Sequence, residues 1–132
     1  MSEYIIENTD GAVIWRVDGK IHREDGPAVE MDDGTKLWCQ NDYYHRIGGP
    51  AVERADGGKE WWRGGKLHRD DGPAVESADG TKEWWRDGRL HREDGPAIER
   101  ADGASSWWVN GARTKPNPQL KLIHPIIDNS TS

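Results

Sequence analysis

Four histidines recur at intervals of 23 residues, and they are the first residues in this sequence whose spacing suggests metal chemistry. They are His22, His45, His68 and His91. A two-stranded unit advances about 9–10 Å along a sheet, because neighbouring strands lie about 4.8 Å apart. Histidines one unit apart are then too distant to share an ion bound at about 2.1 Å. We therefore expect each histidine to anchor its loop through a hydrogen bond, and we expect neither a metal nor a cofactor.

Acidic loops follow these histidines, as in Asp70-Asp71-Gly72, and they raise the possibility of calcium binding. A calcium ion takes six or more oxygen ligands from suitably spaced residues. The corresponding loop of the second unit, Ile47-Gly48-Gly49, lacks both carboxylates and still keeps the length of the repeat. The sequence therefore favours loops held by backbone geometry and Arg–carboxylate pairs over loops held by an ion.

Catalysis is not indicated. General acid–base chemistry needs one particular set of groups in one pocket, whereas His, Arg, Glu and Asp recur here in three or four similar copies. The single cysteine, Cys39, has no evident partner for nucleophilic chemistry. We expect a protein that is not an enzyme.

Tryptophans supply the candidate binding surface. One recurs in every unit, as Trp15, Trp38, Trp61, Trp84 and Trp107. Adjacent residues of a strand point to opposite faces, so we expect this first ring to pack and the following residue to face outwards. That second position is Arg16, Cys39, Trp62, Trp85 and Trp108 in the five units. The predicted binding residues are Trp62, Trp85, Trp108, Arg63 and Arg86, in the C-terminal half.

Two alternatives to this assignment remain. Rings on both faces of a single-layer sheet could simply pack against long side chains. If the faces are reversed, Lys59, Trp61 and Arg63 would form a cation–aromatic strip suited to phosphates or bases.

The elements that must position these residues follow from the repeat itself. Each unit holds two turn signals, an Asp-Gly pair such as Asp79-Gly80 and a second pair such as Asp87-Gly88. The residues between the turns, such as 81–86, have strand length and are rich in aromatics. We predict an all-β fold, an elongated single antiparallel sheet of tandem β-hairpin repeats with capping ends.

The two ends depart from the repeat. Residues 1–9 align with the second half of a unit and are expected to cap the N-terminal end, and residues 10–111 hold the repeats. Residues 112–132 form a divergent C-terminal cap or tail, in which Thr114 replaces the histidine. This apolar tail is expected to cover the open edge of the sheet, and the alternative is a homodimer contact.

The run Trp62-Arg63-Gly64-Gly65-Lys66-Leu67-His68 with the downstream Asp79-Gly80 resembles the membrane occupation and recognition nexus (MORN) repeat. The resemblance covers about residues 10–111 and implies a row of hairpins. The first tryptophan stands one position from the family's tryptophan, and an Arg-Glu-Asp-Gly-Pro loop replaces a family glycine, so this is a MORN-like variant. The motif His-Arg-Glu-Asp-Gly-Pro-Ala also resembles repeats of bacteriophage and giant-virus proteins. This resemblance implies a viral protein that acts on a host system.

Composition limits the function. The net charge of -6 disfavours direct DNA binding, and the single cysteine excludes an intramolecular disulfide. No signal peptide or membrane span is evident, so a cytoplasmic setting is expected, in the host if the protein is viral. The leading hypothesis is a protein-binding module, such as a phage inhibitor of a host immune or nucleic-acid-processing complex. The alternatives are a nucleotide- or sugar-sequestering protein and an acidic nucleic-acid mimic.

Overall fold

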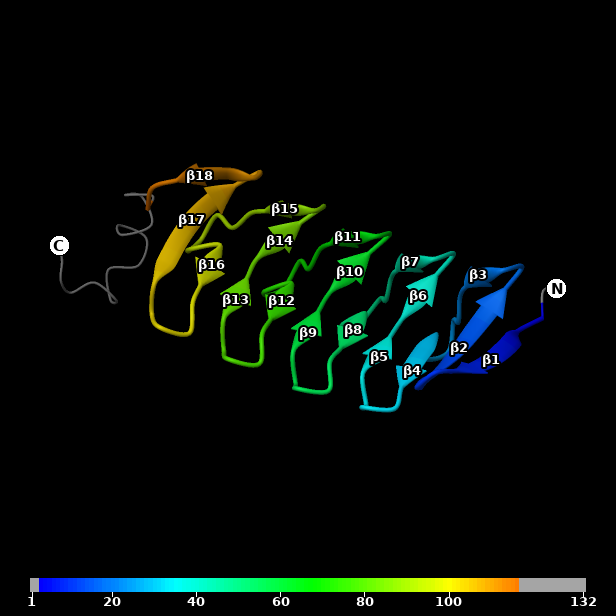
Figure 1. Ribbon diagram of the computed structural model, residues 1–132. Helices are drawn as coiled ribbons and strands as arrows, with labels where there is room; N and C mark the ends of the chain where they lie inside the picture. Colours follow the sequence, from blue (N-terminus) through cyan, green and yellow to red (C-terminus); the bar gives the residue numbers. More distant parts are fainter. Residues whose placement is uncertain (1–2, 117–132) are drawn as a thin grey trace.

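The computed structural model describes residues 3–116, and within this range all regular structure is β, with no helix (Figure 1). Twelve strands form one sheet: β1 (Ile5–Thr9), β2 (Ala12–Val17), β3 (Lys20–Ile21), β4 (Val29–Met31), β5 (Lys36–Leu37), β8 (Val52–Glu53), β9 (Lys59–Glu60), β12 (Val75–Glu76), β13 (Lys82–Glu83), β16 (Ile98–Glu99), β17 (Ser105–Val109) and β18 (Ala112–Thr114). Three further pairs are β6 (Cys39–Gln40) with β7 (Tyr43–Tyr44), β10 (Trp62–Arg63) with β11 (Lys66–Leu67), and β14 (Trp85–Arg86) with β15 (Arg89–Leu90).

The hairpins stand side by side in chain order and form an elongated row (Figure 1). All pairings are antiparallel, and the sheet does not close into a barrel. The predicted all-β row of hairpins is therefore confirmed. None of the described residues forms a helix long and apolar enough to cross a membrane.

In the second, third and fourth units the long strand is interrupted at its first tryptophan, whereas β2 and β17 continue through Trp15 and Trp107. The N–H of Trp61 donates to the carbonyl of Ala74 at 2.7 Å, and the carbonyl of Trp61 accepts from the N–H of His68 at 3.0 Å. The strand therefore changes partner at this residue, because the chain opposite leaves the sheet in the loop from His68 to Pro73. The hairpin tips beyond the tryptophans thus form separate two-stranded pairs, while the main sheet continues below them.

Both predicted turn signals form tight turns. At the tips, Asp87 and Gly88 have φ values of 50° and 80°, which is the pattern of a type I′ turn. At the other end, Gly80 has φ 96°, its N–H donates to the carbonyl of Ser77, and the N–H of Ser77 donates to Thr81. This is a three-residue turn with a glycine bulge. The second unit builds its tip from Asn41 and Asp42, both at positive φ, without glycine.

Opposite charges alternate across the main sheet on one face. The cross-strand register places Glu30, Lys36, Glu53, Lys59, Glu76, Lys82 and Glu99 in one row. Each neighbouring pair in this row has opposite signs, which favours the observed register. The core is thin and consists mainly of small residues: Ala28, Ala51, Ala74 and Ala97 are completely buried.

The N-terminal strand does form an edge, but its register differs from that of the repeats by one residue. Ile6 pairs with Trp15 and Glu7 with Ile14, whereas the aligned Val29 pairs with Leu37, the equivalent of Ile14. The cause is the first turn, a two-residue connection between Thr9 and Ala12 without the bulge. A slip of one residue reverses the faces of a strand. At the other end, β18 completes the last hairpin, and the expected cap beyond residue 116 lies outside the described residues.

Candidate functional site

An arginine stacks on the first tryptophan of each of four units. The guanidinium carbon lies 3.8–4.1 Å from the ring centroid in the pairs Arg23–Trp15, Arg46–Trp38, Arg69–Trp61 and Arg92–Trp84. The arginine comes from the loop directly after the histidine. Its Nη1 donates to the carbonyl of the loop proline, as from Arg69 to Pro73 at 3.0 Å, and pairs with a carboxylate of the sheet, Glu76. The loop is thus folded back onto the face that carries the first tryptophans, which we call the loop face.

A loop glycine packs closely against each guanidinium. A Cβ added at Gly72 would lie 3.0 Å from Cζ of Arg69, and Gly26, Gly49 and Gly95 are equally close to their arginines. None of these four glycines has a positive φ, so the requirement is for space and not for backbone freedom. Sequence reasoning missed this role. The available signal was that Gly49 persists in the second unit although Ile47 and Gly48 replace both neighbouring acids.

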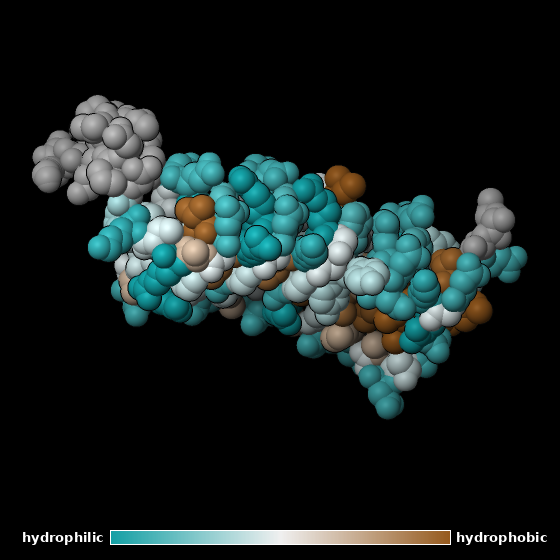
Figure 2. Space-filling model, turned by 90° about the horizontal axis from the view of Figure 1, so that it is seen from above, coloured by the Kyte–Doolittle hydropathy of each residue, from teal (hydrophilic) through white to brown (hydrophobic). Residues whose placement is uncertain are grey.

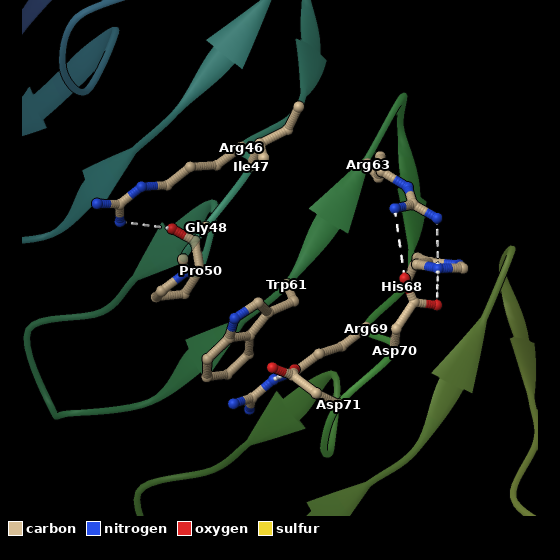
Figure 3. Close-up of a pocket in the computed structure, with 11 residues that line it drawn as sticks. Arg46, Ile47, Gly48, Pro50, Trp61, Arg63, His68, Arg69, Asp70 and Asp71 are labelled. Atoms are coloured by element: carbon tan, nitrogen blue, oxygen red, sulfur yellow. Dashed lines mark hydrogen bonds and ion pairs between the residues drawn. The ribbon is translucent and has the colours of Figure 1, made fainter.

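Successive loops enclose grooves on the loop face, each with a first tryptophan at its base. One lies between the loops of the second and third units and is lined by Ile47, Pro50, Trp61, His68 and Asp71 among others (Figure 3). Equivalent grooves contain Trp38 and Trp84. The structure therefore repeats one type of groove three times and varies only its lining.

The histidines anchor neighbouring units, which extends the expected role. Nδ1 of His68 accepts the N–H of Asp87 at 3.0 Å, in the tip turn of the next unit, and His22, His45 and His91 accept from Asn41, Gly64 and Asn110. An accepting Nδ1 leaves the proton on Nε2, which donates to Asp70 at 2.8 Å. This hydrogen bond lowers the pKa of Asp70 below its usual value, with smaller contributions from the charges of His68 and of nearby arginines.

Trp62, Trp85 and Trp108 lie on the opposite face, which we call the second-tryptophan face. Each ring is half-buried, and its Nε1 donates to the side chain two positions earlier: Trp62 to Glu60 at 2.8 Å, Trp85 to Glu83 at 2.8 Å and Trp108 to Ser106 at 2.9 Å. Trp62 also meets Tyr44 edge to face, with centroids 5.2 Å apart. The rings are therefore held in one repeated orientation.

Arg63 and Arg86 are not beside these rings. Strand alternation places Arg63 on the loop face, where it pairs with Asp70 at 3.6 Å and reaches His68 (Figure 3). Arg86 contacts His91 in the same way. The structure thus separates the five predicted residues into tryptophans on one face and arginines on the other. The alternative strip of Lys59, Trp61 and Arg63 is also changed, because the cation that stacks on the ring of Trp61 is Arg69 from the loop.

Cys39 takes the place of the second tryptophan in the second unit and is buried, with 4 % of its surface exposed. Burial, with a smaller contribution from Asp42, raises the pKa of its thiol to about 11. Such a thiol is a weak nucleophile. Among residues 3–116, no three His, Cys, Asp or Glu side chains lie close enough together to hold a metal ion.

Hydrophobic surface is unevenly distributed. Seen from above, the row of units is largely hydrophilic, and brown colour gathers near the N-terminal end (Figure 2). The large apolar side chains with the greatest exposure include Ile5 and Ile6 in β1 and Tyr43 and Ile47 in the second unit. The second unit therefore differs from its neighbours in its surface as well as in its sequence.

Comparison of the chain with protein-family models, curated proteins and solved structures gives no match. The MORN-like assignment remains a prediction from the residues quoted above.

Proposed function

We propose that this protein is a non-enzymatic protein-binding module that uses the second-tryptophan face. The supporting observation is the row of Trp62, Trp85 and Trp108, each held by an indole hydrogen bond to the residue two positions earlier. Rings that are already oriented lose little conformational freedom on binding, and half-buried aromatics are frequent anchors of protein interfaces. The sheet in Figure 1 is a single layer, with no described element packed over this face.

The hydrogen bonds and carboxylate contacts of the histidines support a role without catalysis. His22, His68 and His91 have a backbone N–H on Nδ1 and a carboxylate near Nε2, and all three form the same pattern. Groups used in this way hold the units together. Under this proposal the partner is a host protein complex, because the amino-acid sequence of the loops resembles repeats of phage and giant-virus proteins.

The test compares Trp62→Ala and Trp85→Ala with Arg16→Ala, which changes the same position in the first unit. Immobilised wild type and variants are exposed to bacterial lysate, and the retained proteins and the melting temperatures are measured. We expect the tryptophan variants to stay folded and to lose a protein that the wild type and Arg16→Ala retain. Equal retention by all four proteins would contradict the proposal, and unfolding of both tryptophan variants would assign these rings to packing.

A nucleotide- or sugar-binding function is the second candidate, and the grooves of the loop face favour it. Each groove combines a tryptophan at its base with arginines in its wall. Quenching of tryptophan fluorescence by mononucleotides or oligosaccharides would support this candidate. The acidic-mimic alternative is disfavoured, because glutamates on the loop face alternate with lysines.

A further inference from the structure

The loop of the second unit lacks two carboxylates that every other complete loop uses internally. Three loops place an acid one residue and another acid two residues after the arginine: Glu24 and Asp25, Asp70 and Asp71, and Glu93 and Asp94. The second loop has Ile47 and Gly48 at these positions. Gly48 also has φ 90°, a conformation that none of the corresponding aspartates adopts.

In the three regular loops the second acid binds Nε of the stacked arginine. Nε donates to Asp25 at 3.1 Å, to Asp71 at 3.0 Å and to Asp94 at 3.0 Å. The first acid lies near Nε2 of the histidine, at 3.2 Å for Glu24, 2.8 Å for Asp70 and 3.4 Å for Glu93. Each regular loop therefore places its own carboxylates beside these two donors.

The second loop keeps both donors in place without those acceptors. Arg46 stacks 3.8 Å from the centroid of Trp38, and its Nη1 donates to Pro50 at 3.0 Å and to Glu53 at 3.2 Å. No side chain or carbonyl among the described residues accepts from its Nε. The Arg46 side chain is 30 % exposed, against 21–23 % for its three counterparts.

His45 has the same vacancy. Its Nδ1 accepts the N–H of Gly64 at 2.9 Å, so Nε2 carries a proton, and within residues 3–116 this Nε2 has no acceptor. His45 and Arg46 line one groove together with Trp38 and Ile47. Ile47 is 82 % exposed at its rim. Glu24 and Asp25 of the preceding loop also line this groove, but they are paired with His22 and Arg23. The second loop therefore adds two donors without an internal acceptor and an exposed apolar side chain to this groove.

We propose that the second loop is a binding site for an acidic peptide segment of a partner protein. A carboxylate of the segment accepts hydrogen bonds from Arg46 Nε and from His45 Nε2, which line the same groove, and an adjoining apolar residue packs on Ile47. We choose an acidic ligand because carboxylates occupy the equivalent positions in all three regular loops, and the donors of the second loop are suited to bind one. This site lies on the loop face and does not depend on the function proposed for the second-tryptophan face.

The test measures the arginine Nε–H signals by NMR during titration with the blocked peptide acetyl-Leu-Asp-Leu-amide. We expect a saturable shift of the Arg46 signal and no shift of Arg23, Arg69 or Arg92. For so small a probe the dissociation constant should be in the range of about 1–10 mM. The peptide acetyl-Leu-Asn-Leu-amide is the neutral control and should leave Arg46 unchanged.

Two matched variants test whether the missing carboxylates of the second loop cause the binding. Ile47→Glu/Gly48→Asp gives the second loop the sequence found in the first and fourth loops, so Arg46 should lose its response. Glu93→Ile/Asp94→Gly removes the internal acids of the fourth loop, and Arg92 should gain a response. The proposal is overturned if Arg46 does not respond, if all four arginines respond equally, or if the asparagine peptide acts as well. If the first variant does not fold, Arg92 in the second variant and the neutral peptide still decide the question.

Discussion

The guanidinium carbon of Arg69 lies 3.9 Å from the ring centroid of Trp61, and a Cβ added at Gly72 would lie 3.0 Å from the same carbon. The pair fixes the loop because the same guanidinium also donates to Pro73 and Glu76. Because these contacts hold the guanidinium in place, a Cβ at Gly72 would press against a side chain that cannot move away without losing them.

Gly72→Ala is therefore expected to lower the free energy of unfolding by about 1–3 kcal/mol, because its Cβ would lie 3.0 Å from Arg69 Cζ. Urea denaturation measures the loss. In an Arg69→Ala background the same alanine should cost much less, since the clashing side chain is gone. Equal costs in both backgrounds would show that the glycine serves another purpose.

His68→Ala is expected to remove the acceptor of one amide in the next unit, and loss of such a partner typically costs about 1–3 kcal/mol. Hydrogen exchange should show faster exchange at the Asp87 N–H, 19 residues away. His45→Ala should instead expose the Gly64 N–H and leave Asp87 protected. Stoichiometric zinc binding that disappears in His68→Ala would contradict the anchoring role.

Cys39 is expected to react slowly with iodoacetamide in the folded protein. With a pKa of about 11, far less of the thiol is ionised at pH 8 than in an unfolded chain, where the pKa is about 8.5. Alkylation followed by mass spectrometry should be about 100-fold slower without urea than with it. A similar rate in both conditions would show that the site opens readily.

The raised thiol pKa also sets a direction for alkaline stability. A folded-state pKa above the unfolded value gives stabilisation that is complete below about pH 8.5 and declines as the pH rises towards 11. The urea midpoint of the wild type should therefore fall over this range more than that of Cys39→Ala. Parallel curves for the two proteins would contradict the expectation.

Acid should weaken the turns at Asp33 and Asp79. The backbone N–H groups of Thr35 and Thr81 donate to these carboxylates at 2.9 Å and lower their pKa values. Lowered values give stabilisation that is present above about pH 3.9 and is lost as the pH falls further. The urea midpoint of Asp33→Asn/Asp79→Asn should drop less between pH 5 and pH 2.5 than that of the wild type. Identical drops would exclude a contribution from these turns.

The sequence predicted the features that depend on local backbone chemistry. The unit length, the hairpins and the tip turns follow from glycine, aspartate and asparagine at fixed positions. The partner of Trp61 was not predicted, because the nearest cations on its strand are Lys59 and Arg63, whereas the stacked Arg69 returns from a loop. The register of β1 was also missed, since an Asp-Gly pair fits turns with and without a bulge.

Within residues 3–116, the hydrogen bonds between units, such as the one that His68 accepts and the one that Ile21 donates, join only adjacent hairpins. Genetic recombination between equivalent codons of two units would delete or duplicate one hairpin. Each new junction would again place a histidine Nδ1 beside a turn amide. The number of repeats can therefore change while the contact between adjacent units stays the same. A single loop, such as that after His45, can likewise diverge while its neighbours hold the register.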